Sequence, residues 1–104
     1  MMLGFSQGAA TASRWAAYGG LQPDELVLWS GLLAHDLDRA RAAERLGDTR
    51  VRFVVGRDDR FRNDAALAEQ QAWLDQVGVG CGMVDYDGGH RLDPDTLLQL
   101  ARDT

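Results

Sequence analysis

Ser6 is the first residue of this sequence that could carry out covalent chemistry. It lies in the stretch Gly4-Phe5-Ser6-Gln7-Gly8, which fits the pattern G-x-S-x-G. This pattern is typical of a nucleophilic serine on a sharp turn between a strand and a helix. A serine hydroxyl is a weak nucleophile that needs a base, a group to orient the base, and donors for the developing oxyanion. The sequence offers candidates for each of these groups.

The base could come from either of two histidines. His90 ends the stretch Asp87-Gly88-Gly89-His90 and follows the last predicted strand. Ligand chemistry in an open parallel sheet occurs on loops at the carboxyl ends of the strands. His35 is expected on a loop or at a helix start, with no special role. We therefore favour His90, which also comes last in the chain.

The acid is expected in the stretch Val55-Gly56-Arg57-Asp58-Asp59, just after another predicted strand. Asp58 and Asp59 are adjacent, and only one of them can point at the histidine. The residues alone leave the choice between the two open.

The turn at Ser6 accounts for the glycines and supplies an oxyanion donor. A strained backbone at Ser6 is expected to leave no room for side chains two positions away, which would require both Gly4 and Gly8. The following helix would point its free amides at the serine, and the backbone N–H of Gln7 is the natural oxyanion donor.

The elements that must position these residues alternate along the chain. Short apolar runs bounded by glycine predict strands, and spacings of three and four predict helices. Asp93 and Pro94 form a recognised helix start. This order predicts an α/β fold with a parallel sheet in a three-layer α/β/α sandwich, with the first strand at an edge. The predicted strands precede Ser6 and span 26–29, 51–55 and 83–86, and the predicted helices span 7–18, 36–46, 64–77 and 94–102.

Composition narrows the class of protein. The 104 residues carry a formal net charge of -5 with no basic stripe, so nucleic acid is not expected as a partner. Cys81 is the single cysteine, and no signal peptide or apolar run long enough to span a membrane is visible. We therefore expect a cytoplasmic protein.

Taken together, the segments around these residues resemble the α/β-hydrolase superfamily. The resemblance is greatest to its phospholipase/carboxylesterase branch, which includes acyl-protein thioesterase-like enzymes. It rests on "GFSQGAA", "LWSGLL", "VVGRDDRF" and "DGGHRL", and on the chain order of serine, aspartate and histidine. The resemblance implies a serine hydrolase of carboxylic esters or thioesters that uses no metal or cofactor.

Carried over by position, the resemblance makes Ser6 the nucleophile, Asp59 the acid and His90 the base. Gln7 would donate its N–H to the oxyanion. Three more residues would shape the substrate pocket: Phe5, Ser30 and Gly31.

The resemblance covers only the C-terminal half of the hydrolase fold, so residues 1–104 are expected to be one N-terminally truncated domain. The loop that supplies the second oxyanion N–H would be absent. One alternative is therefore an inactive fragment that self-associates, as a homodimer, through its exposed sheet edge. A module that binds acyl chains without turnover is a further alternative.

Overall fold

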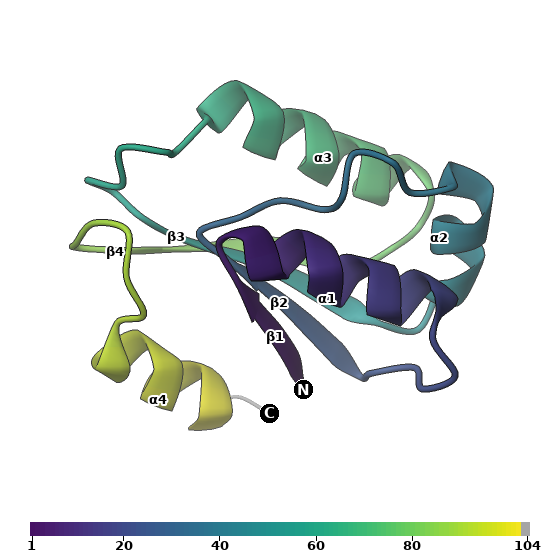
Figure 1. Cartoon of the computed structure of the whole chain (residues 1–104), viewed down its shortest axis with the longest axis horizontal. Helices are drawn as coiled ribbons and strands as arrows, with labels where there is room; N and C mark the ends of the chain where they lie inside the picture. The colour runs from purple at the N-terminus through teal and green to yellow at the C-terminus, as the bar shows by residue number, and fades with distance from the viewer. Residues whose placement is uncertain (103–104) are drawn as a thin grey trace.

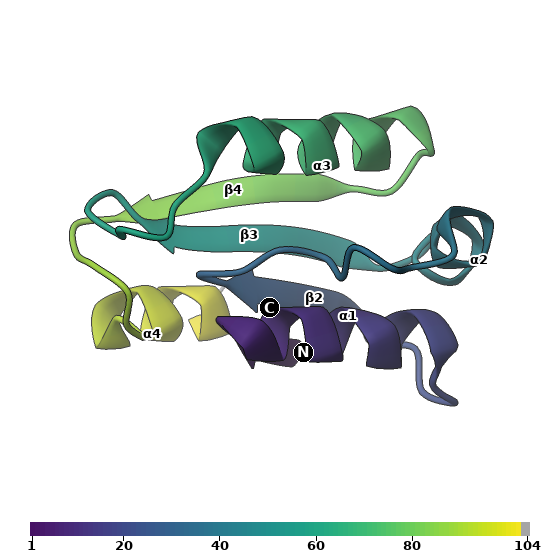
Figure 2. The same cartoon turned by 45° about the horizontal axis from the view of Figure 1, so that its top comes forward.

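The fold is a four-stranded parallel sheet with four helices, described over residues 1–102 of the chain by a computed structural model. The strands lie side by side in chain order, as Figure 2 shows for β2, β3 and β4. The strands are β1 (Met2–Phe5), β2 (Glu25–Trp29), β3 (Arg50–Gly56) and β4 (Cys81–Tyr86). The helices are α1 (Gln7–Tyr18), α2 (Arg39–Arg45), α3 (Asp64–Gln76) and α4 (Pro94–Arg102).

The register of the strands brings their carboxyl ends together. Phe5 pairs with Trp29, Trp29 pairs with Val54, and Gly56 pairs with Tyr86. Because all the strands are parallel, the segments that follow them meet at the carboxyl-terminal end of the sheet. Every candidate catalytic residue follows a strand at this end.

Alternate residues of each strand pack on opposite faces of the sheet. One face is covered by α1, α2 and α3, with a core that includes Leu28, Phe53 and Leu74. The other face is covered by α4, whose Leu100 packs with Trp29. Figure 1 shows α4 well apart from the other three helices. The three-layer sandwich is therefore present, with one thick helical layer and one thin one.

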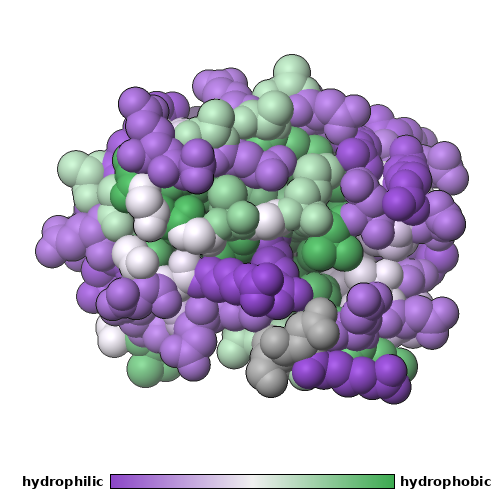
Figure 3. Space-filling model, turned by 180° about the vertical axis from the view of Figure 1, so that it is seen from behind, coloured by the Kyte–Doolittle hydropathy of each residue, from purple (hydrophilic) through white to green (hydrophobic). Residues whose placement is uncertain are grey.

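The thin layer leaves part of the sheet weakly covered. Leu3, Phe5 and Val84 pack against the second face but remain only partly buried. Seen from behind, hydrophobic atoms gather near the middle of the molecule, with hydrophilic atoms around them (Figure 3). The predicted edge position of the first strand is also confirmed, because β1 pairs with β2 alone.

The expected elements are confirmed with one notable difference. Helix α2 begins at Arg39, three residues later than the predicted start at Asp36. The cause is capping, since the Asp38 side chain accepts from the Arg41 N–H at 3.0 Å and fixes the start there. The predicted start at Asp93 is right, and its carboxylate accepts from the backbone N–H of Thr96 at 3.1 Å.

Candidate active site

Ser6 sits on a sharp turn between β1 and α1. Its backbone angles are φ 58° and ψ -121°, which a residue with a side chain rarely adopts. Its N–H donates to the carbonyl of Trp29 at 2.7 Å, so neighbouring β2 holds the strained turn in place. The serine side chain is thereby presented at the carboxyl end of the sheet.

The two glycines that flank Ser6 are not equivalent. A Cβ at Gly4 would collide with the carbonyl of Gly8 and lie 2.7 Å from the Cα of Ala9. A Cβ at Gly8 would meet nothing within 4 Å. The expectation that the turn requires both glycines is therefore right for Gly4 and wrong for Gly8. The reason is that Gly8 faces an open groove along the free edge of β1.

His90 lies on the loop after β4 and reaches the serine directly. Its Nε2 is 2.9 Å from Ser6 Oγ, although the two residues are 84 positions apart in the chain. The imidazole is packed between two aromatic rings, with its centroid 5.1 Å from that of Phe5 and 4.9 Å from that of Phe61. Phe5 therefore contacts the candidate base, and the side chain of His90 is 24% exposed.

Two buried aromatic residues hold the loop that carries His90. Trp29 donates from Nε1 to the carbonyl of Arg91 at 2.9 Å. The hydroxyl oxygen of Tyr86 lies 2.7 Å from the carbonyl of Gly89 and 2.6 Å from that of Arg91, so it can donate to either. The residues on both sides of His90 are thus anchored to the sheet. Sequence reasoning missed this network, because nothing in the sequence pairs Trp29 with a loop 62 positions away.

Asp59 is the acid that contacts the histidine. Its Oδ2 lies 2.9 Å from Nδ1 of His90, and its Oδ1 accepts from the N–H of Phe61 at 2.8 Å. The carboxyl group is almost wholly buried, at 1% exposed, whereas Asp58 is exposed. Asp58 instead donates its backbone N–H to the carbonyl of Gly88, which ties the acid loop to the histidine loop.

Two opposing effects set the charge of Asp59. Burial alone would raise the pKa of its carboxyl group, but hydrogen bonds from His90 and from the Phe61 amide outweigh it. The pKa of Asp59 therefore lies below its ordinary value of 3.8. With Asp59 ionised, Nδ1 of His90 carries the proton and donates to Oδ2, which leaves Nε2 free to accept from the Ser6 hydroxyl.

The remaining predicted site residues lie around this line of hydrogen bonds. Ser30 and Gly31 follow β2, and a Cβ at Gly31 would collide with the carbonyl of Ser6 and lie 2.6 Å from Cβ of Ala9. Gln7 is the first residue of α1, where a backbone N–H has no partner within the helix. Ser30, Gly31 and Asp59 line one small cavity of about 40 Å³.

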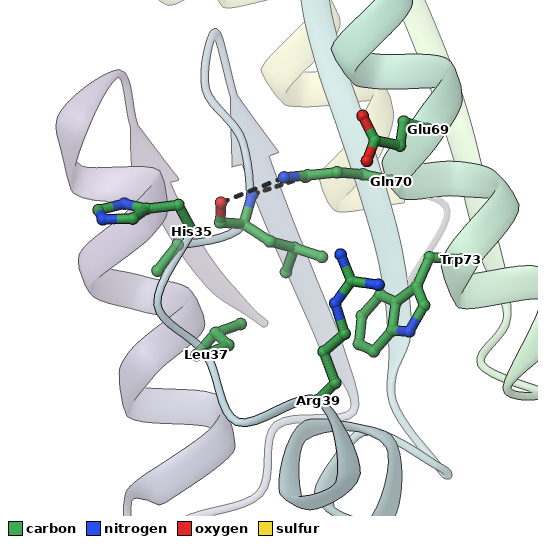
Figure 4. Close-up of a pocket in the computed structure, with 8 residues that line it drawn as sticks. His35, Leu37, Arg39, Glu69, Gln70 and Trp73 are labelled. Atoms are coloured by element: carbon green, nitrogen blue, oxygen red, sulfur yellow. Dashed lines mark hydrogen bonds between the residues drawn. The ribbon is translucent and has the colours of Figure 1, made fainter.

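His35 lies elsewhere, in a pocket of about 210 Å³ between the segment after β2 and helix α3 (Figure 4). There the Gln70 side chain binds both the N–H and the carbonyl of Leu33, at 2.9 and 3.2 Å. The guanidinium of Arg39 stacks over the ring of Trp73, 5.5 Å from its centroid. This pocket contains neither Ser6 nor His90.

Among residues 1–102, no group of three or more His, Cys, Asp or Glu side chains is placed to hold a metal ion. None of the helices described there is both long and apolar enough to cross a membrane.

Comparison with solved structures places the fold among known hydrolases. Acyl-protein thioesterase 2 of Zea mays matches with a TM-score of 0.70 and 22% identity, over 96% of this chain and 52% of that chain. A carboxylesterase from Mesorhizobium loti matches with a TM-score of 0.73 and 20% identity, over 98% and 48%. An alpha/beta hydrolase from a Medee basin deep-sea metagenome matches with a TM-score of 0.65 and 14% identity, over 97% and 50%.

The chain thus spans about half the length of these structures. No protein-family model matches the sequence, and no curated protein matches it either.

Proposed function

Since the chain has the fold of an α/β hydrolase, over about half the length of its structural neighbours, we propose that it carries the catalytic residues of a serine hydrolase. The proposed substrates are carboxylic esters or thioesters. One observation carries the proposal: the unbroken line of hydrogen bonds from Ser6 Oγ through the His90 imidazole to Asp59, at 2.9 Å for each step. The strained backbone of Ser6 at the end of a strand adds support.

In the proposed reaction, Ser6 Oγ attacks the carbonyl carbon of the substrate while Nε2 of His90 takes the hydroxyl proton. The tetrahedral intermediate collapses, the bond to the leaving alcohol or thiol breaks, and His90 returns the proton to the leaving group. Water then attacks the acyl-serine by the same route and releases the acid. Asp59 keeps His90 in the tautomer that accepts at Nε2 and stabilises the imidazolium that forms.

The oxyanion would be stabilised by the amide of Gln7 at the start of α1. The helix dipole adds to this, because its positive end lies at the same place. One donor in such a site is typically worth about 10² to 10³ in turnover. The Gln7 amide is therefore expected to contribute substantially to acylation of Ser6.

The substrate side of the proposal rests on a groove along the free edge of β1, whose lining includes Phe5 and Gly8 from the turn but not Ser6 or His90 themselves. This groove has a volume of about 440 Å³ and is lined mainly by apolar or small residues, among them Met2, Phe5, Gly8 and Trp15. It carries no charged side chain, which favours an uncharged acyl group as the occupant.

We also infer a reducing, cytoplasmic setting, because Cys81 is the one cysteine of the sequence.

Trapping of the acyl-enzyme tests the proposal. The protein is mixed with p-nitrophenyl acetate and with an acetyl thioester, quenched in acid and digested for mass spectrometry. An acetyl group on the peptide that contains Ser6, lost in Ser6→Ala, is the expected result. An intact fold with no acetylation of this peptide by either reagent would contradict it.

A second candidate is an inactive fragment that self-associates through the sheet edge. The observation that favours it is the free edge of β1, which leaves backbone donors and acceptors unpaired beside the exposed ring of Trp15. Sedimentation equilibrium distinguishes the candidates. Self-association should weaken in Trp15→Arg but not in Leu21→Arg, a matched change at a residue exposed elsewhere. A strictly monomeric parent protein would rule this candidate out.

A further inference from the structure

Ser30 shares an unusual backbone conformation with Ser6. Among residues 1–102, these are the two non-glycine residues with positive φ, at 52° for Ser30 and 58° for Ser6. This region of backbone space costs free energy for any residue with a side chain, and such residues cluster at functional sites. At Ser6 the conformation presents the candidate nucleophile. Ser30 therefore calls for an explanation of the same kind.

The surroundings of Ser30 fix its backbone tightly. Its N–H donates to the carbonyl of Val54 at 2.7 Å, which extends the sheet by one step beyond β2. The next residue, Gly31, packs so closely on Ser6 that a Cβ there would collide with the Ser6 carbonyl. Ser30 thus lies between the turn of the nucleophile and the loop of the acid, and it lines the same small cavity as Asp59.

The hydroxyl of Ser30 is buried and unpaired. Its Oγ has almost no exposed surface and no hydrogen-bond partner in the part of the chain that the structure describes. A buried hydroxyl left in this state costs free energy, so a nearby acceptor is expected to bind it. Because Oγ is buried, it is also shielded from a substrate in the open groove.

Asp59 is the candidate acceptor, because it lines the same small cavity as Ser30. A carboxylate offers about four lone-pair positions, and His90 and the Phe61 amide occupy two of those on Asp59. Burial raises the pKa of Asp59, whereas the Ser30 hydroxyl lowers it, less strongly than His90 and the Phe61 amide do.

We propose that Ser30 is a positioning residue whose hydroxyl donates to the carboxylate of Asp59 and fixes it opposite His90. The inference rests on the proposed function for its catalytic meaning, since Ser30 acts on the reaction only through Asp59. The strained turn at Ser30 is then explained, because it directs a side chain at the end of β2 toward the acid that follows β3.

The test measures the pKa of the Asp59 carboxyl group by carbon-detected NMR in the parent protein and in three variants. Ser30→Ala removes the hydroxyl and keeps the Cβ. Ser30→Gly removes the hydroxyl and also relieves the backbone strain, so it provides a folded variant even if Ser30→Ala is unstable. Ser13→Ala is the matched control, because Ser13 is also buried, but its hydroxyl accepts from Ala34 and donates to Ala10.

The expected result is a rise of about one unit in the pKa of Asp59 in both Ser30 variants, the size of one lost hydrogen bond to a charged group. Ser13→Ala should leave this pKa unchanged, although it loses a buried hydroxyl. An unchanged pKa of Asp59 in folded Ser30→Gly would overturn the proposal.

The measurement does not depend on turnover. A rise in the Asp59 pKa together with a chain that forms no acyl-enzyme would support the role of Ser30 and contradict only the proposed function. Where the chain is active, the acid limb of its pH–rate profile should also move to higher pH in Ser30→Gly.

Discussion

Replacement of Asp59 by asparagine changes one hydrogen bond in a way that the structure makes predictable. The asparagine has the same shape, and its side-chain oxygen can still accept from the N–H of Phe61, 2.8 Å away in the parent. Its amide NH₂ then faces Nδ1 of His90, where the carboxylate oxygen lay at 2.9 Å. Nδ1 must become an acceptor, so the proton moves to Nε2 and His90 can no longer accept from Ser6.

The expected loss of acylation rate is large because nearly every molecule of Asp59→Asn carries the His90 proton on Nε2. In a serine protease with a Ser-His-Asp triad, the same change lowers turnover by about 10⁴, or about 5.5 kcal/mol of transition-state stabilisation. The near-complete burial of Asp59, at 1% exposed, argues for the full effect, since water cannot replace the lost acceptor.

The assay is the rate of Ser6 acylation by p-nitrophenyl acetate, with Asp58→Asn as the matched control. Asp58 is exposed and neighbours Asp59 in the sequence, so its replacement should change the rate by less than about threefold. Nitrogen NMR of the His90 ring reports the tautomer directly, and it does so whether or not the chain is active. We expect the proton on Nδ1 in the parent and on Nε2 in Asp59→Asn.

Two results would refute this reasoning. One is an acylation rate in Asp59→Asn that matches the parent. The other is a His90 ring that keeps its Nδ1 proton in the variant, which would mean that Asp59 does not set the tautomer.

Three further predictions concern the parts that hold the site. Gly4→Ala should lower the free energy of unfolding by about 1–3 kcal/mol through steric overlap. Gly8→Ala has open space around the new methyl group and should raise the free energy of unfolding by up to about 1 kcal/mol. Chemical denaturation measures both values, and equal changes in the two variants would contradict the description of the turn. Tyr86→Phe should slow Ser6 acylation several-fold, because the loop that carries His90 loses a hydrogen-bonded anchor. Tyr18→Phe should not slow it, because the hydroxyl of Tyr18 binds the backbone of Asp38, far from the site. Equal acylation rates in the two variants would argue against this role of Tyr86. The pKa of Asp59 in the folded protein lies below 3.8, so the ionised carboxylate stabilises the fold fully above the pKa of the unfolded chain, and this stabilisation is lost as the pH falls through the folded pKa. Acid unfolding followed by circular dichroism should therefore be less steep in Asp59→Asn than in the parent. Identical acid-unfolding curves for the two proteins would count against the lowered pKa.

Much of this arrangement could be predicted from sequence because its signals are local. The glycines and the alanine-rich helix around Ser6 mark a strand, a turn and a helix within a dozen residues, and the structure has them there. The predicted edge position of β1 is confirmed by the strand order of the structure. The adjacent carboxylates of Asp58 and Asp59 looked alike in the sequence, and they differ in the structure because one is buried against His90 and the other is exposed.

The rest depends on contacts between distant parts of the chain. The anchoring of the histidine loop by Trp29 and Tyr86 requires the final packing of β2, β4 and the loop. The open space at Gly8 follows from the free edge of β1, which no local pattern at the turn reveals. The positive φ of Ser30 is equally hidden, because serine is not a residue that signals this conformation.

The most direct test of the account is labelling of the purified 104-residue chain with a fluorophosphonate, which reacts only with an activated serine. Labelling confined to Ser6, absent in Ser6→Ala and strongly reduced in Asp59→Asn, is the result that the hydrogen-bonded line from Ser6 to Asp59 predicts. A folded protein that takes up no label at Ser6, or one that labels equally well in Asp59→Asn, would contradict the central claim that these three residues activate the serine.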